Sequence, residues 1–458
     1  MTPQLLRKLA RKLGADAVQT SPPPEYSGDK WFARETPDCV VFPRSAEEVS
    51  FVMREATKAG VPVTPRGAGY GYVGGCTPVK HGIVLSLERM NRILEVNERD
   101  FVAVVEPGVI TGDLQEAARE KNLLYAPDPA SLKDCSIGGN IATNAGGPRC
   151  LKYGVTRNSL LGLEVVLPDG AIVRCGGRTH KNKTGFDLVG LFTGSEGLLG
   201  IVTQATVRLL PLPPARALLS AGFPNMEAAA AGIQSVFAHG FLPAAVEVAD
   251  GFTLGAARAY QPEAPFPPGN AQVIIEVDGQ PASVRGEAKA LAAILEKAGA
   301  SGIVRATKAS DCEKIWGLRR VYSQSLKATG LKKLNEDVVV PRGRLVDLVR
   351  FAADLQKRTG FPIACFGHAG DGNIHVNIMV ADPENPGVQK ASAAALDELF
   401  GQVLAWGGSI TGEHGIGLAK KPWWPQAVTP ATRALHSTLK KALDPTGILN
   451  PGKFVTSK

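Results

Sequence analysis

Glycine-rich loops set between short apolar runs constrain the fold of this 458-residue chain more than any other feature. The first loop reads PRGAGYGYVGG (65–75), the second SIGGNIATNAGGPRC (136–150) and the third GSEGLLGIVT (194–203). Without Cβ atoms, successive backbone N–H groups can converge on an anion such as a pyrophosphate. No loop is a Walker sequence, and none opens a clear helix as a Rossmann fingerprint does. Structural turns would explain any single loop, but the three together predict a long dinucleotide laid against them.

The apolar pattern predicts two successive regions that each mix helices with strands. Residues 36–211 alternate short strands with helices such as 45–60 and 111–122. The proline cluster PLPPAR (211–216) then marks a boundary. Beyond it, further helices alternate with strands such as those within 361–380. A chain of this length exceeds one ordinary core, so we expect separate domains.

The formal net charge of +8 comes from scattered lysines and arginines, not from a dense basic tract. This argues against a nucleic-acid-binding protein and favours an anionic substrate, an anionic cofactor or an acidic partner. The seven cysteines form no CxxC pair. We therefore expect reduced thiols in a cytoplasmic protein, and no cysteine-based zinc or iron–sulfur site.

The N-terminal residues 1–18 predict an amphipathic helix with leucines on one face and basic residues opposite. They lack the apolar core of a signal peptide. No run of the chain approaches the roughly 18 to 20 apolar residues that a membrane span needs. We expect this helix to pack on the body of the protein. The alternative is a weak peripheral contact with the inner membrane.

Two of the seven histidines flank a glycine loop in FGHAGDGNIHVNIMV (366–380). The run after the loop alternates, so His375, Asn377 and Met379 share one strand face and apolar residues the other. A hairpin here would bring His368 and His375 to one rim. Glu413 is adjacent to His414 in TGEHGIG. Two imidazoles and a carboxylate are a usual ligand set for Zn²⁺ or a similar ion, although histidines bonded to backbone in glycine turns are the alternative.

Several segments, in order, resemble the vanillyl-alcohol-oxidase superfamily of FAD proteins. They are PRGAGYGYVGG, VVEPGV, PDPASLKDCSIGGNIATNAGG, KYGVTRNSLLGLEVVLPDG and LFTGSEGLLGIVTQATVRL. The most similar branch contains D-lactate dehydrogenases, D-2-hydroxyglutarate dehydrogenase and the glycolate oxidase flavin subunit, and the resemblance covers about residues 36–458.

The resemblance implies an α+β fold. A FAD-binding domain with two subdomains would span residues 1–214. An α/β substrate or cap domain with an antiparallel sheet would span 215–411. Residues 412–458 would complete the active site and return to the FAD-binding domain.

The same resemblance assigns the FAD contacts. Tyr70 stands where some relatives carry a histidine bound covalently to the flavin, so we expect non-covalent FAD. The implied contacts are Pro65, Arg66, Gly67, Ala68, Gly69 and Tyr70 at the pyrophosphate; Pro127, Ser131, Gly138, Gly139, Asn144 and Gly146 along the flavin; Glu196, Gly197, Gly200 and Ile201 near the ribose and adenine; and Asn450 at the flavin ring.

The motifs GHxGDGNxH and GEHG imply the reacting groups. His368, His375 and Glu413 would bind the metal, which we expect to be zinc, and His414 would be the catalytic base. Arg319, in WGLRR, would bind the substrate carboxylate, because an arginine fork suits that group. Asn377 is a further substrate candidate. A lysine is implied at the far end of the substrate, where the sequence offers Lys332 and Lys333, and we take Lys333.

These residues predict oxidation of a D-2-hydroxy acid to its 2-oxo acid, with hydride passing to flavin N5. D-lactate, glycolate and D-2-hydroxyglutarate share the same chelating head. No haem or nicotinamide motif is present, so we expect an external acceptor: an electron-transfer flavoprotein, a quinone or a partner subunit. A homodimer or a subunit of a complex is expected. The alternatives are a flavin-carrying subunit of a multi-subunit glycolate oxidase, or a metal hydrolase whose glycine loops bind a nucleotide.

Overall fold

The computed structural model describes residues 1–455, and the chain divides into two compact units. Unit 1 comprises Met1–Gly147, Gly154–Leu212 and the chain from Glu413 onward. Unit 2 comprises Pro148–Tyr153 and Pro213–Gly412. The expected boundaries at 214 and 411 lie within two residues of these divisions. The six-residue segment that belongs to unit 2 within the glycine-rich half was not predicted.

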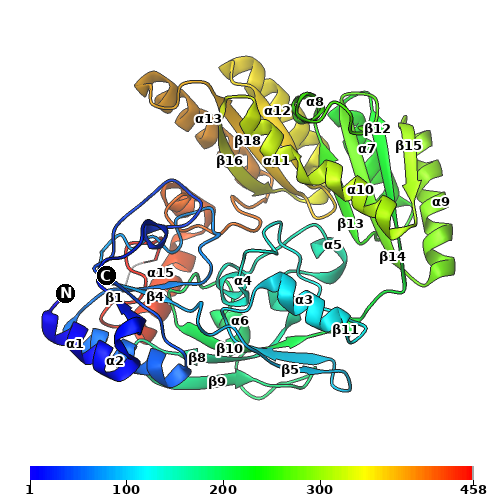
Figure 1. Ribbon diagram of the computed structural model, residues 1–458. Helices are drawn as coiled ribbons and strands as arrows, with labels where there is room; N and C mark the ends of the chain where they lie inside the picture. Colours follow the sequence, from blue (N-terminus) through cyan, green and yellow to red (C-terminus); the bar gives the residue numbers. More distant parts are fainter. Residues whose placement is uncertain (456–458) are drawn as a thin grey trace. The chain divides into compact units, whose positions relative to one another are not determined.

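The N-terminal part of unit 1 is a four-stranded sheet in the order β1-β2-β4-β3 (Figure 1). Its helix α2 (Ala46–Ala59) confirms the predicted helix: Ser45 accepts the N–H of Glu48, and Gly60 ends it in the left-handed region. Leucines of the N-terminal helix α1 are buried in the same core, so that helix packs on the body as expected. The remaining elements are α1 (Pro3–Leu13), β1 (Val18–Gln19), β2 (Cys39–Val41), β3 (Val63–Arg66) and β4 (Ile83–Ser86).

The second part of unit 1 is a five-stranded antiparallel sheet in the order β5-β6-β10-β8-β9. The predicted helix at 111–122 is confirmed as α3 but ends at Arg119. The elements are β5 (Ile93–Asn97), β6 (Val102–Val105), α3 (Thr111–Arg119), β7 (Leu123–Leu124), α4 (Ile137–Thr143), β8 (Leu160–Val166), β9 (Ile172–Gly176), α6 (Leu188–Phe192), β10 (Ile201–Arg208) and β11 (Leu210–Pro211).

The C-terminal chain completes unit 1. It contains α14 (Trp424–Ala427) and α15 (Pro430–Leu443). The residues after α15 then run beside β3, where the N–H of Val63 donates to Ile448 O and the N–H of Asn450 donates to Val63 O. Segments almost 400 positions apart in the sequence therefore lie side by side. No helix within residues 1–455 combines the length and the apolar character needed to cross a bilayer.

Unit 2 is built on a seven-stranded antiparallel sheet in the order β15-β12-β14-β13-β17-β18-β16. Helices α7, α9, α12 and α13 cover one face, and α8, α10 and α11 pack on the other (Figure 1). The strands are β12 (Ala215–Phe223), β13 (Ala245–Ala249), β14 (Ala271–Gly279), β15 (Ser301–Ala306), β16 (Lys332–Val339), β17 (Ile363–His368) and β18 (Asn373–Val380). The helices are α7 (Met226–Ala238), α8 (Gly251–Tyr260), α9 (Pro281–Lys297), α10 (Ala309–Arg320), α11 (Tyr322–Ala328), α12 (Leu345–Thr359) and α13 (Pro386–Ala405).

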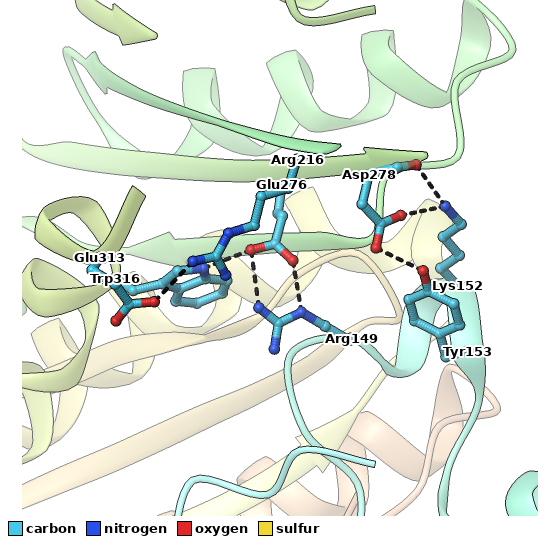
Figure 2. Close-up of polar contacts among 8 residues, drawn as sticks. All are labelled: Arg149, Lys152, Tyr153, Arg216, Glu276, Asp278, Glu313 and Trp316. Atoms are coloured by element: carbon cyan, nitrogen blue, oxygen red, sulfur yellow. Dashed lines mark hydrogen bonds and ion pairs between the residues drawn. The ribbon is translucent and has the colours of Figure 1, made fainter. Parts of the chain in front are cut away.

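The unpredicted segment of unit 2, residues 148–153 with the short helix α5 (Cys150–Tyr153), is held by two acids of β14 (Figure 2). Arg149 donates through Nε and Nη2 to the buried Glu276, at 2.6 and 3.0 Å, and Trp316 Nε1 donates to the same carboxylate at 2.7 Å. Lys152 and the hydroxyl of Tyr153 both bond Asp278. Glu276 and Asp278 are two residues apart, so both project from one face of the sheet.

Candidate active site

The predicted histidine hairpin is present as β17 and β18, which pair in antiparallel register. His368 lies opposite Asn373, and His375 lies opposite Phe366, so both histidines project from one sheet face. Their rings are 5.6 Å apart between centroids, and both side chains are buried. Gly372 has a φ of +86° and its missing Cβ would meet the backbone oxygen of Val340, so the tight turn requires glycine. The predicted alternation along β18 is confirmed.

A buried glutamate on the neighbouring strand β13 orients the first histidine. Glu247 Oε1 lies 2.6 Å from His368 Nδ1, and Glu247 Oε2 accepts Nε–H of Arg319 at 2.5 Å. Burial alone would raise the pKa of Glu247, but the charges and hydrogen bonds of His368 and Arg319 outweigh it and hold the pKa at about 2. A carboxylate at Nδ1 favours the tautomer whose Nε2 carries the lone pair, as in histidines that bind metals.

The third predicted metal ligand, Glu413, directly follows Gly412, the last residue of unit 2. Its carboxylate and the imidazoles of His368 and His375 offer donor atoms that all lie within 4.8 Å of one another. The backbone N–H of Gly412 donates to Asp337 Oδ2 at 2.8 Å, which fixes the start of this loop on β16. Two imidazoles, one carboxylate and a supporting glutamate are the donor set of an open zinc site, so the residues fit a divalent metal.

The predicted base, His414, lies beside the ring of Tyr72, with 5.4 Å between centroids and 33° between planes. Its Nε2 is 3.9 Å from Glu413 Oε1. Two residues further on, the N–H groups of Ile416 and Gly417 donate to the carboxylate of Glu196. Glu196 therefore holds the backbone of this loop two residues after His414. An imidazole held in this way is suited to accept a proton.

Two of the predicted substrate residues, Asn377 and Lys333, share the sheet face of the histidines, and the third, Arg319 of α10, packs against that face. Arg319 lies over the ring of Phe366 at 4.9 Å. Within the described residues, Arg319 bonds Glu247 through Nε only. Its two Nη groups therefore remain for the carboxylate of a ligand. Asn377 is fully buried and its Oδ1 lacks a hydrogen-bond partner among residues 1–455. Lys333 Nζ donates to Ser323 Oγ at 2.9 Å.

Strand register places these polar groups in rows. Asp337, Asn335 and Lys333 of β16 lie opposite His375, Asn377 and Met379 of β18. Burial, reinforced by the charges of Lys327 and Arg319, lowers the pKa of Lys333 to about 8. Lys332 is on the opposite face by strand alternation, and the role of Lys333 toward a substrate stays a prediction. Within this row, the Lys333 end offers a cation, whereas the other end is the buried acid Asp337.

The glycine loops gather within unit 1. A Cβ on Gly67 would meet Ser136 Oγ at 2.5 Å and Gly139 N at 3.2 Å, so the first loop lies against the second. A Cβ on Gly197 would meet Pro65 Cγ at 2.6 Å, which adds the third loop. Asn450 Nδ2 donates to Glu196 O at 2.8 Å, and its buried Oδ1 has no partner within the described chain. The close approach of the three glycine loops, together with the unpaired oxygen of Asn450, fits a bound dinucleotide.

Other residues predicted to contact FAD already bond or pack within the protein. Arg66 donates to the backbone oxygens of Glu25 and Gly67. Asn144 ends α4 in the left-handed region and accepts the N–H of Arg157. The side chain of Ile201 is part of the hydrophobic core. Their roles toward FAD, like those of Pro127, Ser131, Gly146 and Gly200, stay predictions.

Sequence reasoning missed one acid, Glu247, and the structural role of another, Glu196. Glu247 had a detectable signal, because it is the one charged residue in the buried run AAVEVA. A charge in such a run needs a partner. The role of Glu196 toward Ile416 and Gly417 had no local signal, since 220 positions separate the partners. Sequence reasoning expected Glu196 at the cofactor.

Comparison with known families identifies the chain as an FAD-linked oxidoreductase. Residues 37–176 match the family described as FAD binding domain, and residues 212–454 match FAD linked oxidases, C-terminal domain. The chain belongs to the FAD-linked oxidases.

The chain groups with enzymes of the D-lactate dehydrogenase and glycolate oxidase type. It is 39% identical to glycolate oxidase subunit GlcD of Bacillus subtilis (strain 168), over 91% of this chain and 89% of that protein. It is 33% identical to D-lactate dehydrogenase of Anaerostipes hadrus, over 99% and 98%. The solved structure of p-cresol methylhydroxylase superposes with a TM-score of 0.80 at 20% identity, covering 99% of this chain and 97% of that one. The α+β fold class is thereby confirmed.

Proposed function

We propose that this chain oxidises a D-2-hydroxy acid of the D-lactate, glycolate or D-2-hydroxyglutarate class to the 2-oxo acid. The reaction uses non-covalent FAD and a divalent metal, for which zinc is the first candidate. One observation carries the proposal: His368, His375 and Glu413 present their donor atoms within 4.8 Å of one another, in a chain of the FAD-linked oxidases. Such a cluster is unnecessary for binding FAD alone.

When bound, the metal and FAD supply a Lewis acid for the substrate hydroxyl and an acceptor for hydride. The residues of the chain do the rest. The Nη groups of Arg319 bind the substrate carboxylate, and Glu247 holds both Arg319 and His368 in place. An imidazole nitrogen of His414 takes the hydroxyl proton while the α-hydrogen leaves with its electron pair. The substrate loses two electrons and two hydrogens and becomes the 2-oxo acid.

Electrons leave the reduced flavin to an external acceptor. We propose an electron-transfer flavoprotein, a quinone or a partner subunit, and we place the protein in the cytoplasm or at the inner membrane surface. The name of the glycolate oxidase relative, a subunit, favours one specific second candidate. In that form this chain is the flavin-carrying subunit of a multi-subunit glycolate oxidase. Co-purification of partner chains with the tagged native protein would separate that arrangement from a homodimer.

The test is an anaerobic stopped-flow screen of D- and L-2-hydroxy acids that follows bleaching of the flavin. We expect a D-acid or glycolate to bleach it, and a chelator to abolish the reaction until Zn²⁺ or another divalent ion is restored. Bleaching at the full rate after exhaustive demetallation would refute the metal's role. A colourless protein that cannot be loaded with FAD would instead favour a metal hydrolase with nucleotide-binding loops.

A further inference from the structure

We propose that Glu196 is a positioning residue whose carboxylate fixes the loop that carries Glu413 and His414. This inference rests on the proposed function, because it gives the loop its catalytic task. The sequence suggests only a cofactor contact for Glu196, as part of the third glycine loop. The structure instead gives its carboxylate a partner in the chain itself.

Both oxygens of Glu196 bond the loop. Oε1 accepts the N–H of Ile416 at 2.7 Å and Oε2 accepts the N–H of Gly417 at 2.8 Å, and both bonds are buried. The loop can pass this close only with glycines. Gly415 has a φ of +88°, and its missing Cβ would lie 2.8 Å from Glu196 Oε1. Gly417 has a φ of +49°, and its Cβ would meet the backbone oxygen of Val73.

The backbone of Glu196 is itself fixed. Its φ of +50° is one that L-residues adopt rarely. Its N–H donates to Ala142 O at 2.8 Å, and its carbonyl accepts Nδ2–H of Asn450 at 2.8 Å. The side chain thus projects from a backbone bonded on both sides. The carboxylate of Glu196 therefore holds the loop of His414 in a fixed place relative to the glycine loops of unit 1.

Carboxylates hold this loop at both ends. Asp337 accepts the N–H of Gly412 immediately before Glu413, and Glu196 accepts two N–H groups immediately after Gly415. Only Glu413, His414 and Gly415 lie between. The carboxylate of Glu196 is chemically required, because both of its partners are donors. A glutamine offers one acceptor oxygen and would point an N–H₂ group at the other N–H.

The experiment compares wild-type holoenzyme with Glu196→Gln and with a matched control, Asp444→Asn. Asp444 is also a buried carboxylate that accepts two successive backbone N–H groups, from Ile448 at 3.2 Å and Leu449 at 2.9 Å. It also bonds Lys440, and all of these partners lie outside residues 412–417. Each variant is assayed for bound FAD, amide hydrogen exchange, flavin reduction rate at saturating substrate, and substrate dissociation constant.

For Glu196→Gln we expect faster exchange at residues 416 and 417 and a reduction rate about 10- to 100-fold lower, since small misplacements of a catalytic group have effects of this size. Bound FAD should be unchanged and the substrate dissociation constant should stay within about threefold, as for a group that acts only in the chemical step. Asp444→Asn should exchange faster at 448 and 449 and keep its reduction rate.

Unchanged exchange at 416 and 417, or equal losses of rate in both variants, would overturn the proposal. If Glu196→Gln does not hold FAD, the same comparison uses Glu196→Asp, which keeps the charge but withdraws the carboxylate by one methylene. The two hypotheses fail separately. If no 2-hydroxy acid reduces wild-type flavin, the proposed function is wrong, and the exchange measurement still decides whether Glu196 holds the loop.

Discussion

At the scale of single side chains, the proposed role of Lys333 is to bind the far end of the substrate. Lys333 is partly buried at the end of the row formed with Asn335 and Asp337, and desolvation lowers its pKa to about 8. We predict that Lys333→Met weakens binding of D-2-hydroxyglutarate about 10- to 100-fold and of D-lactate little, because only the former has a second carboxylate to lose a charge-assisted bond. Anaerobic titration of flavin bleaching measures both affinities.

The pH dependence of the same binding has a definite sign. Above about pH 8 the Lys333 ammonium loses its proton, so wild-type affinity for D-2-hydroxyglutarate should fall as pH rises through this value. Lys332→Met is the matched control, because Lys332 is the next residue on the same strand and projects from the other face. Equal weakening of both acids by Lys333→Met would show that the lysine does not read the far end of the substrate.

Glu247 makes a second prediction about a single residue. Glu247→Gln replaces the charged acceptor beside His368 Nδ1 with a neutral amide, and groups that orient metal-binding histidines typically contribute 10- to 100-fold to metal affinity. We therefore expect Zn²⁺ affinity, measured by competition with a chromophoric chelator, to fall by about that factor.

The control for this change is Glu276→Gln, on the neighbouring strand β14. Glu276 is an equally buried glutamate paired with an arginine, but its partners are Arg149 and Trp316 and include no histidine. Its loss should leave Zn²⁺ affinity unchanged. If the two variants bind Zn²⁺ alike, the Glu247–His368 contact has no role in metal binding.

Among the loops, residues 148–153 depend on long-range bonds for their place in unit 2. The segment leaves unit 1 after Gly147 and returns at Gly154, with Arg149, Lys152 and Tyr153 bonded to β14 (Figure 2). We predict that Glu276→Gln releases it, because removing one member of a buried ion pair leaves the other charge uncompensated. Amide exchange in peptides that cover 148–153 should become faster, and the melting temperature should fall.

Lys152→Ala is the comparison for that prediction. Its bond to Asp278 is partly exposed, and exposed ion pairs contribute only about 0 to 1 kcal/mol. Exchange in the segment should then change little. Protection that survives Glu276→Gln but is lost in Lys152→Ala would reverse the assignment of the anchor.

Sequence patterns predicted the elements whose signals are local. The caps at Ser45 and Gly60 bounded α2, and the period-two alternation placed His375 and Asn377 on one face of β18. The partners of these residues could not be predicted in the same way. Glu247 meets His368, and Glu196 meets Ile416, across more than 100 positions. Such pairs depend on strand order and loop packing, and neither leaves a periodic trace in one sequence.

Most residues assigned to FAD and most residues assigned to the metal lie in different units, and the exception is Glu413, a proposed metal ligand that belongs to unit 1. The glycine loops expected to hold FAD lie in unit 1, whereas His368, His375 and Glu247 lie in the sheet of unit 2. Each group therefore rests on its own hydrophobic core. Loss of the metal-binding residues of unit 2 therefore need not unfold unit 1, and loss of FAD contacts in unit 1 need not unfold unit 2.

This separation predicts that the two cofactors can be removed independently. His368→Ala should lose most of its affinity for Zn²⁺, because one of three protein ligands is gone, yet retain FAD with an unchanged visible spectrum. Conversely, deflavinated wild type should still bind Zn²⁺. Absorbance at the flavin band and metal analysis of the dialysed protein measure the two contents. His239→Ala, at an exposed histidine at the end of α7, should change neither. Loss of FAD from His368→Ala would mean that the histidine cluster supports the flavin site itself, and the assignment of this cluster to a separate metal would be wrong.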